Sequence, residues 1–225
     1  MQRVLKVAFA ISFIAFVACA CTTSARDADE VTPIVWKLDS VSKVGGHAVR
    51  ALGSPPVVGE GEERAVCFNG ASDALLIDDN PILGWRQFTI EALIKPDAVG
   101  PEEQRFLHIQ DEHESRLLLE TRLAQRQWAL DTFLFVSQDI RLTLLDRQKA
   151  HPAEQWHWVA LTFDGETMRH YVEGEQELEG KIAFQPMTKG RMSIGVRLNQ
   201  VSWFKGCIRE IRFTPAALQQ ASLQK

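Results

Sequence analysis

The stretch WHWVALTFDGETMRHYVEG, residues 156–174, decides the fold class. On both sides of Asp164-Gly165, apolar residues recur at alternate positions, as in two strands that each bury one face. Asp-Gly is a favoured turn pair because glycine accepts a positive φ at little cost. The stretch therefore predicts an antiparallel hairpin.

Runs of the same kind fill most of the remaining chain. They are VWKL (35–38), RAVCFNG (64–70), DALLID (73–78), QFTIEALIKPD (87–97), RFLHIQ (105–110), RLLLETRL (116–123), QWALDTFLFV (127–136), RLTLLD (141–146), RMSIGVRL (191–198) and CIREIRFT (207–214). Only PAALQQASLQ (215–224) is expected to be helical, as a turn or two at the C-terminus. Roughly ten to twelve short strands in about 185 residues predict an all-β fold of two packed antiparallel sheets.

Alternation also assigns side chains to the two faces of each strand. On RLLLETRL, Leu118, Glu120 and Arg122 share one face, and the opposite face is mostly leucine. On RFLHIQ, strict alternation places Phe106 with His108, and Arg105 with residues 107 and 109. The five polar residues DEHES (111–115) between these runs predict a hairpin loop. The polar side chains are thus expected on one side of a half-buried sheet.

Four segments, taken in order, resemble a laminin G-like module of the concanavalin A-like lectin/glucanase superfamily. They are AVCFNGASDALLI (65–77), FTIEALIKPD (88–97), QWHWVALTFDGETMRHYVEG (155–174) and WFKGCIREIRFTPAAL (203–218). The resemblance covers about residues 33–218 and leaves 219–225 as a tail. It implies a jelly-roll sandwich of two antiparallel sheets. Because this fold hosts lectins, hydrolases, lyases and protein-binding modules, it leaves the function open.

The N-terminal residues differ in kind from the rest. MQRVLK is basic, and VAFAISFIAFVA (7–18) is apolar but too short to span a bilayer of roughly 30 Å. Residues 1–21 are therefore expected to be an export signal and 22–32 a linker. FVACAC resembles a bacterial lipoprotein signal, in which Cys21 or Cys19 is lipidated; the alternative is ordinary cleavage after Ala20 or Ala25. The protein is accordingly expected in the periplasm or at the outer membrane or cell surface, with a lipid anchor as its one membrane attachment.

Composition and cysteine count limit the classes of protein that fit this sequence. A chain that is 45% hydrophobic with a net charge of −4 suits a globular domain and has no basic field for nucleic acid. Besides Cys19 and Cys21, the chain holds Cys67 and Cys207. In an exported protein these two either form a disulfide or remain buried thiols.

No strand carries the paired carboxylates of a glucanase. Glu91 is followed on its face by Leu93 and Lys95, and Glu112 and Glu114 fall in the expected loop. If the chain were a polysaccharide-degrading enzyme, His108 and Glu120 would be its candidate catalytic residues. The chain is read as non-catalytic, with this enzyme as the alternative.

Candidate ligand-binding residues lie on the polar face described above and near one tryptophan. The first group is Arg105 or His108, with Glu120, Arg122 and Asp131. Its alternative is a Glu120–Arg122 pair in solvent. The second group, Arg197, Asn199 and Trp203, is expected at the rim of a site where the indole stacks on a sugar. Trp156 and Trp158 are expected in the core.

Calcium is the one cofactor considered, through Asp73, Asp78 and Asp79; the alternative is ordinary turn chemistry. Taken together, the sequence favours a cell-envelope binding module with a glycan as ligand. A protein-interaction or adhesion module with an envelope protein as partner is the remaining alternative.

Overall fold

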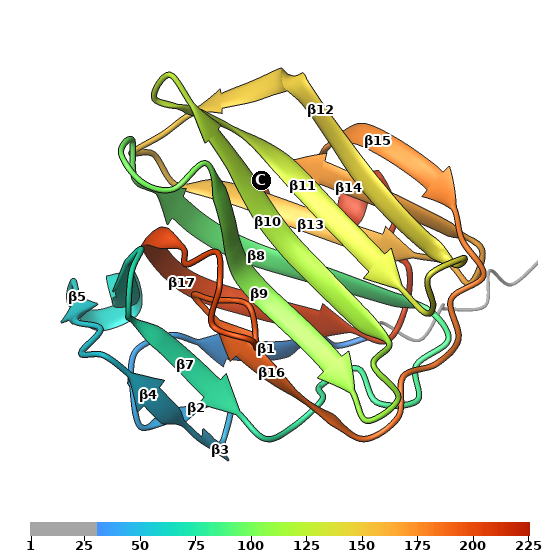
Figure 1. Ribbon diagram of the computed structural model, residues 1–225, viewed down its shortest axis with the longest axis horizontal. Coiled ribbons are helices and arrows are strands. Elements are labelled where there is room, and N and C mark those ends of the chain that lie inside the picture. The colour runs from blue at the N-terminus through green and yellow to red at the C-terminus, as the bar shows by residue number, and fades with distance from the viewer. Residues whose placement is uncertain (1–30) are drawn as a thin grey trace, which may run out of the picture. The chain divides into compact units, whose positions relative to one another are not determined.

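Two antiparallel sheets packed face to face make up most of the computed structural model (Figure 1). The structure describes residues 31–225, and the expectations for the export signal, Cys19 and Cys21 lie outside this part of the chain. In the described residues, no helix is long and apolar enough to cross a bilayer. The all-β sandwich expected from the sequence is confirmed.

One sheet has eight strands and the other seven. The eight-stranded sheet runs in the order β15 (Glu175–Lys181), β14 (Thr167–Val172), β13 (His157–Phe163), β8 (Phe88–Pro96), β17 (Lys205–Thr214), β6 (Ala65–Asn69) and β5 (Val57–Val58), and β1 (Ile34–Lys37) also pairs with β17. The seven-stranded sheet runs in the order β12 (Arg141–Pro152), β11 (Gln127–Phe135), β10 (Arg116–Ala124), β9 (Glu103–Asp111), β16 (Gly190–Ile194), β7 (Ala74–Ile77) and β4 (Arg50–Leu52). The short strands β2 (Lys43–Val44) and β3 (His47–Ala48) pair with each other, and η1 (Gly61–Glu63) is a single 3-10 turn.

The hairpin expected at 156–174 is formed by β13 and β14, which pair from Val159 to Phe163. In its turn, the Asp164 carboxylate accepts hydrogen bonds from the backbone N–H groups of Glu166 (3.0 Å) and Thr167 (2.8 Å). Gly165 has a φ of 101°, which a residue with a side chain rarely adopts. The Asp-Gly pair thus acts as the sequence predicts.

The hydrophobic core lies between the two sheets. From the eight-stranded sheet, β8 contributes Phe88, Ile90, Ala92 and Ile94 to it. From the seven-stranded sheet, β10 contributes Leu117, Leu119 and Leu123. These residues recur at every second position because successive side chains of a strand point to opposite faces.

The C-terminal segment is not the expected helix. Within 215–224 the structure has only the 3-10 turn η2 (Gln220–Ser222). The backbone of this segment bonds to the outer face of β8 instead: Leu218 N–H donates to Thr89 Oγ1 (2.8 Å) and Gln224 N–H to Glu91 Oε1 (2.8 Å). The compact unit therefore extends to Lys225 and includes the residues assigned to a tail.

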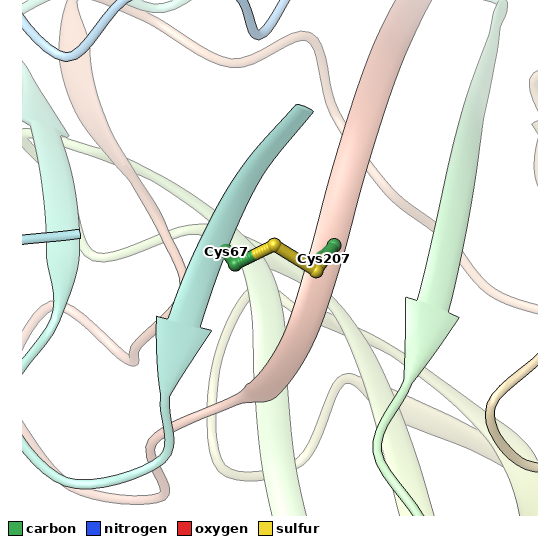
Figure 2. The surroundings of a disulfide bond; sticks show 2 residues. All are labelled: Cys67 and Cys207. Carbon is green, nitrogen blue, oxygen red and sulfur yellow. A yellow bond between two sulfur atoms is a disulfide. The ribbon is translucent and has the colours of Figure 1, made fainter. Parts of the chain in front are cut away.

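Cys67 and Cys207 form a disulfide (Figure 2). They lie directly opposite each other on β6 and β17, with their Cα atoms 4.0 Å apart. The bond joins residues 140 positions apart in the chain. The disulfide alternative is confirmed over that of two free thiols.

Candidate functional site

A cavity of about 230 Å³ lies on the outer face of the seven-stranded sheet, away from the core. In Figure 1 its strands β9, β10 and β11 lie in front of β8 and β13. The cavity is lined by Arg105, Arg116, Leu118, Glu120, Arg122, Asp131, Phe133, Thr143 and Arg197. We call this cavity the groove.

The register of β9, β10 and β11 brings the central residues of the groove together. Glu120 of β10 lies directly opposite Asp131 of β11 on one side and Arg105 of β9 on the other. Since Arg122 follows Glu120 by two positions on the same strand, it shares the same face. Four of the sequence-predicted ligand residues are thus neighbours.

An irregularity in β9 decides which of its side chains reach the groove. Leu119 pairs with Leu107 but Glu120 with Arg105, so Phe106 is an extra residue in the ladder. Such a bulge reverses the alternation of the strand. Phe106 and Leu107 both lie in the core, and Arg105 and His108 both lie on the groove side. Strict alternation placed Phe106 with His108 and Arg105 with Leu107, and that prediction is wrong.

Arg105 and Arg122 hold the groove's carboxylates in a network of ion pairs. Glu120 Oε1 lies 2.9 Å from Arg105 Nε, and its Oε2 lies 3.1 Å from Arg122 Nη2. Arg122 Nε donates to Asp131 Oδ2 at 2.6 Å. Glu103, at the start of β9, accepts a hydrogen bond from Arg105 Nη1 at 2.9 Å and forms an ion pair with Arg122 Nη1 at 2.8 Å. The Glu120 side chain is only 2% exposed, so its pairing is buried and not the solvated pair considered as the alternative.

Burial shifts the acidity of both central carboxyls. Desolvation is the main cause that raises the pKa of Glu120 to about 7, with the neighbouring Asp131 charge as a second cause. Burial also raises the pKa of Asp131. The charges of Arg105 and Arg122 oppose both shifts. The protonation of Glu120 is therefore expected to change near neutral pH.

His108 is buried beside the groove and does not line it. Its Nδ1 accepts a hydrogen bond from Leu198 N–H at 2.9 Å, which ties the loop between β16 and β17 to β9. Burial lowers the pKa of His108 to about 3, helped by nearby arginines, of which Arg197 has the largest effect. A general base works best with a pKa near the working pH, so this histidine suits a structural role.

The loop between β16 and β17 separates the three residues predicted at the rim. Arg197 lines the groove. Asn199 is exposed outside it. Trp203 is half-buried against a small cluster that includes Leu76 and Val196. Only Arg197 of this group therefore reaches the cavity.

Arg116 and Phe133 are groove residues that the sequence analysis missed. The Arg116 guanidinium lies 3.7 Å from the centroid of the Phe135 ring and 5.9 Å from that of Phe133. Side-chain alternation along the strands would have indicated both residues. Arg116 shares a face of β10 with Glu120, and Phe133 shares a face of β11 with Asp131. Phe133, not Trp203, is the aromatic ring of the groove.

The three aspartates considered for calcium have separate surroundings. Asp73 is buried and accepts from Ser54 N–H at 3.0 Å. Asp79 lies 3.4 Å from His47, and Asp78 is exposed. Among residues 31–225, no three His, Cys, Asp or Glu side chains are grouped so that they could hold a metal ion.

Comparison with known proteins identifies the family of this chain. A model of the concanavalin A-like lectin/glucanases superfamily matches residues 69–224, more than half of the chain. The chain belongs to this superfamily. No match was found among curated protein sequences.

Several solved structures share the fold of this chain. Domain 4 of AbnA, an extracellular arabinanase from Geobacillus stearothermophilus solved with arabinotriose, matches with a TM-score of 0.64 and 17% identity, over 86% of this chain and 97% of that one. The botulinum neurotoxin serotype G binding domain matches with a TM-score of 0.62 and 8% identity, over 84% and 48%. The serotype D ligand binding domain with N-acetylneuraminic acid matches with a TM-score of 0.61 and 14% identity, also over 84% and 48%. This chain thus spans about half the length of the two toxin chains, and the likeness shows the fold.

Proposed function

We propose that this protein is a non-catalytic binding module and that the groove binds a glycan. One observation carries the proposal: the lining of the cavity combines the apolar side chains of Leu118 and Phe133 with several charged groups. A sugar ring has an apolar face that stacks on an aromatic ring and hydroxyls that bond to polar neighbours. The composition of the groove matches both parts of such a ligand.

The polar groups of the groove are already held in place. Glu120 lies between Arg105 and Arg122, and Arg122 also holds Asp131. Groups that are fixed before binding lose little freedom when the ligand arrives, which favours affinity. A cavity of about 230 Å³ suits one ring of a sugar chain whose other units lie outside it.

Two solved relatives support glycan as the ligand class. The arabinanase domain was solved with arabinotriose, and the serotype D toxin domain with N-acetylneuraminic acid. Because one fold hosts many functions, the groove residues carry the argument and the relatives add to it.

The proposal includes a place in the cell. The basic and apolar N-terminal residues support export, and Cys21 is the proposed lipid anchor at the cell envelope. Labelling with a radioactive fatty acid is expected for the wild type and not for Cys21→Ser. Labelling of the variant would point to Cys19 instead, and an unlabelled wild type would overturn the lipid anchor.

A polysaccharide-degrading enzyme is the second candidate, and one observation favours it. Glu120, with its raised pKa, lies directly opposite Asp131, and a carboxyl that is protonated near neutral pH can serve as a general acid. Release of new reducing ends from a bound polysaccharide, lost in Glu120→Gln, would establish the enzyme in place of the binding module.

Affinity electrophoresis of the full chain, in mild non-ionic detergent, tests the binding module. Gels contain neutral or acidic polysaccharides, with calcium and then with EDTA. Retarded migration in at least one gel is expected. Phe133→Ala should weaken it roughly 2- to 10-fold through lost stacking, while Trp156→Ala should not. Trp156 is the matched control because it stacks against Lys95 and Arg209 of the other sheet. Migration that no polysaccharide retards would overturn the glycan proposal.

A further inference from the structure

The four arginines of the groove divide into two kinds. Arg105 and Arg122 have carboxylate partners in Glu103, Glu120 and Asp131. Arg116 and Arg197 line the same cavity, and neither forms a salt bridge with any side chain that the structure describes. Two of the four positive charges therefore have no salt-bridge partner in this part of the protein, and the charge of Glu114 only partly offsets that of Arg116.

Arg116 is held in place without such a partner. Its guanidinium packs on the ring of Phe135, and Nη1 donates a long hydrogen bond of 3.4 Å to the carbonyl of Glu114. Its Nε is buried and has no hydrogen-bond partner among the described residues. A partly desolvated charge is costly unless it is paired, so this head group is prepared for an anion from outside.

Arg197 lies in the loop between β16 and β17 and lines the same cavity as Arg116. Because both line one cavity, the two positive charges repel, and the charge of Arg197 lowers the pKa of Arg116 after burial as the larger cause. His108 lies near both and is neutral. An anion between the two arginines would remove this repulsion.

The net charge of the groove favours the same class of ligand. Four arginines and two carboxyls line it, whereas the whole chain has a net charge of −4. The raised pKa of Glu120 reduces the negative charge in the groove further near neutral pH. A concave positive site in a negative protein concentrates anions locally. Arginine also offers paired N–H donors that match the oxygens of a carboxylate or sulfate.

We propose that the ligand is an acidic glycan and that Arg116 and Arg197 receive its carboxylate or sulfate group. This proposal rests on the glycan-binding function and adds the class of glycan. The neighbouring Phe133 and Leu118 then contact the ring that carries the acidic group, and Arg105 and Arg122 mainly hold the carboxylates of the groove in place.

The test compares matched polysaccharides in affinity gels with the full chain. Polygalacturonate is set against its methyl ester, which has the same sugar without the charge, and dextran sulfate against dextran. We expect retardation by one acidic member and little by its neutral counterpart. Retardation by polygalacturonate identifies a carboxylate ligand, and retardation by dextran sulfate identifies a sulfate.

Variants distinguish binding at a specific site from general attraction between opposite charges. Arg197→Gln should weaken binding to the acidic polysaccharide about tenfold to a hundredfold, the effect of losing a charged hydrogen bond. The Arg197 side chain makes no hydrogen bond with the described residues, so this variant should fold. Arg116→Gln should act in the same direction. Arg191→Gln removes the same charge from an exposed position outside the groove and should leave binding unchanged.

Three results would overturn the inference, and they can be told apart. Equal retardation by charged and neutral members, still weakened by Phe133→Ala, would leave glycan binding intact and exclude the acidic class. Equal weakening by Arg191→Gln and Arg197→Gln would mean that net charge alone attracts the polysaccharide. Retardation by no polysaccharide, charged or neutral, would overturn the proposed function itself.

Discussion

Arg122 donates from Nε to Oδ2 of Asp131 at 2.6 Å, across the pairing of β10 with β11. Arg122 is also the residue that joins Asp131 to Glu120, whose side chain it contacts at 3.1 Å. Both carboxyls are almost fully buried, at 1% and 2% exposed. One guanidinium therefore pairs with both buried acids, and Glu120 has a second partner in Arg105.

Arg122→Met is expected to lower the free energy of unfolding by about 3–5 kcal/mol at pH 8, because it leaves the buried Asp131 without its salt-bridge partner and Glu120 with Arg105 alone. Urea denaturation measures this. Arg126→Met, which breaks an exposed pair with Glu154, is the control and should cost at most about 1 kcal/mol.

The loss of unfolding free energy caused by Arg122→Met should be smaller at pH 5 than at pH 8. Without the arginine, the pKa values of Glu120 and Asp131 rise further above their unfolded values, so the folded variant binds more protons than the unfolded chain. Its stability then increases as the pH falls. A deficit that is equal at pH 5 and pH 8 would contradict this account of the network.

His170 should make the fold sensitive to acid. It is buried between the sheets, with Nδ1 3.0 Å from Thr132 Oγ1 and Nε2 3.7 Å from Glu177. Burial, followed by the charge of His151, lowers the pKa of His170 to about 4. Since an unfolded histidine has a pKa of about 6.5, the unfolded chain binds more protons between these values. The stability from this group is full above pH 6.5 and is lost as the pH falls toward 4.

His170→Gln removes that titration. Unfolding free energies measured by urea denaturation between pH 4.5 and 7.5 should rise with pH less steeply in the variant, by up to about 1.4 kcal/mol per pH unit. Identical slopes in the two proteins would show that His170 titrates as it does in the unfolded chain.

Replacing both disulfide cysteines, Cys67→Ser with Cys207→Ser, should lower the free energy of unfolding by about 5 kcal/mol. The bond closes a loop of 140 residues, and the chain-entropy model predicts a loss of this order for such a loop. Wild type in a reducing agent should denature at the same urea concentration as the double variant. If a reducing agent also shifted the urea midpoint of the double variant, its effect on the wild type could not be assigned to the Cys67–Cys207 bond.

Deleting residues 219–225 should destabilise the domain by about 2–4 kcal/mol. The deletion removes Leu223, which packs against Ala160 and Tyr171, and the N–H of Gln224 that bonds to the buried Glu91. Leu223→Ala alone should account for about half or more of the loss. If the truncated chain melts at the same temperature as the full chain, this segment is a tail after all.

The sequence predicts the fold well because alternation and turn chemistry are local properties. The hairpin around Asp164-Gly165 and the leucine face of β10 follow from residues a few positions apart. The same period of two would have found Arg116 and Phe133, once Glu120 and Asp131 had been chosen.

Three features were beyond such reasoning because each depends on a partner far away in the chain. The bulge at Phe106 exists only relative to β10. The segment 215–224 has helical periodicity, but its backbone bonds to side chains of β8. Trp203 packs on Leu76, which the sequence does not place near it. Each of these features depends on how the strands are placed in the folded sandwich.

The disulfide also has a consequence for a chain exposed to proteases. The covalent ring that it closes runs from Cys67 to Cys207 and contains every residue that lines the groove. A single cut in any loop of that ring, such as the exposed turn at Gln125-Arg126, leaves both fragments in one covalent molecule. Such a nicked protein would keep its mass apart from one added water, and would separate into two pieces only after reduction.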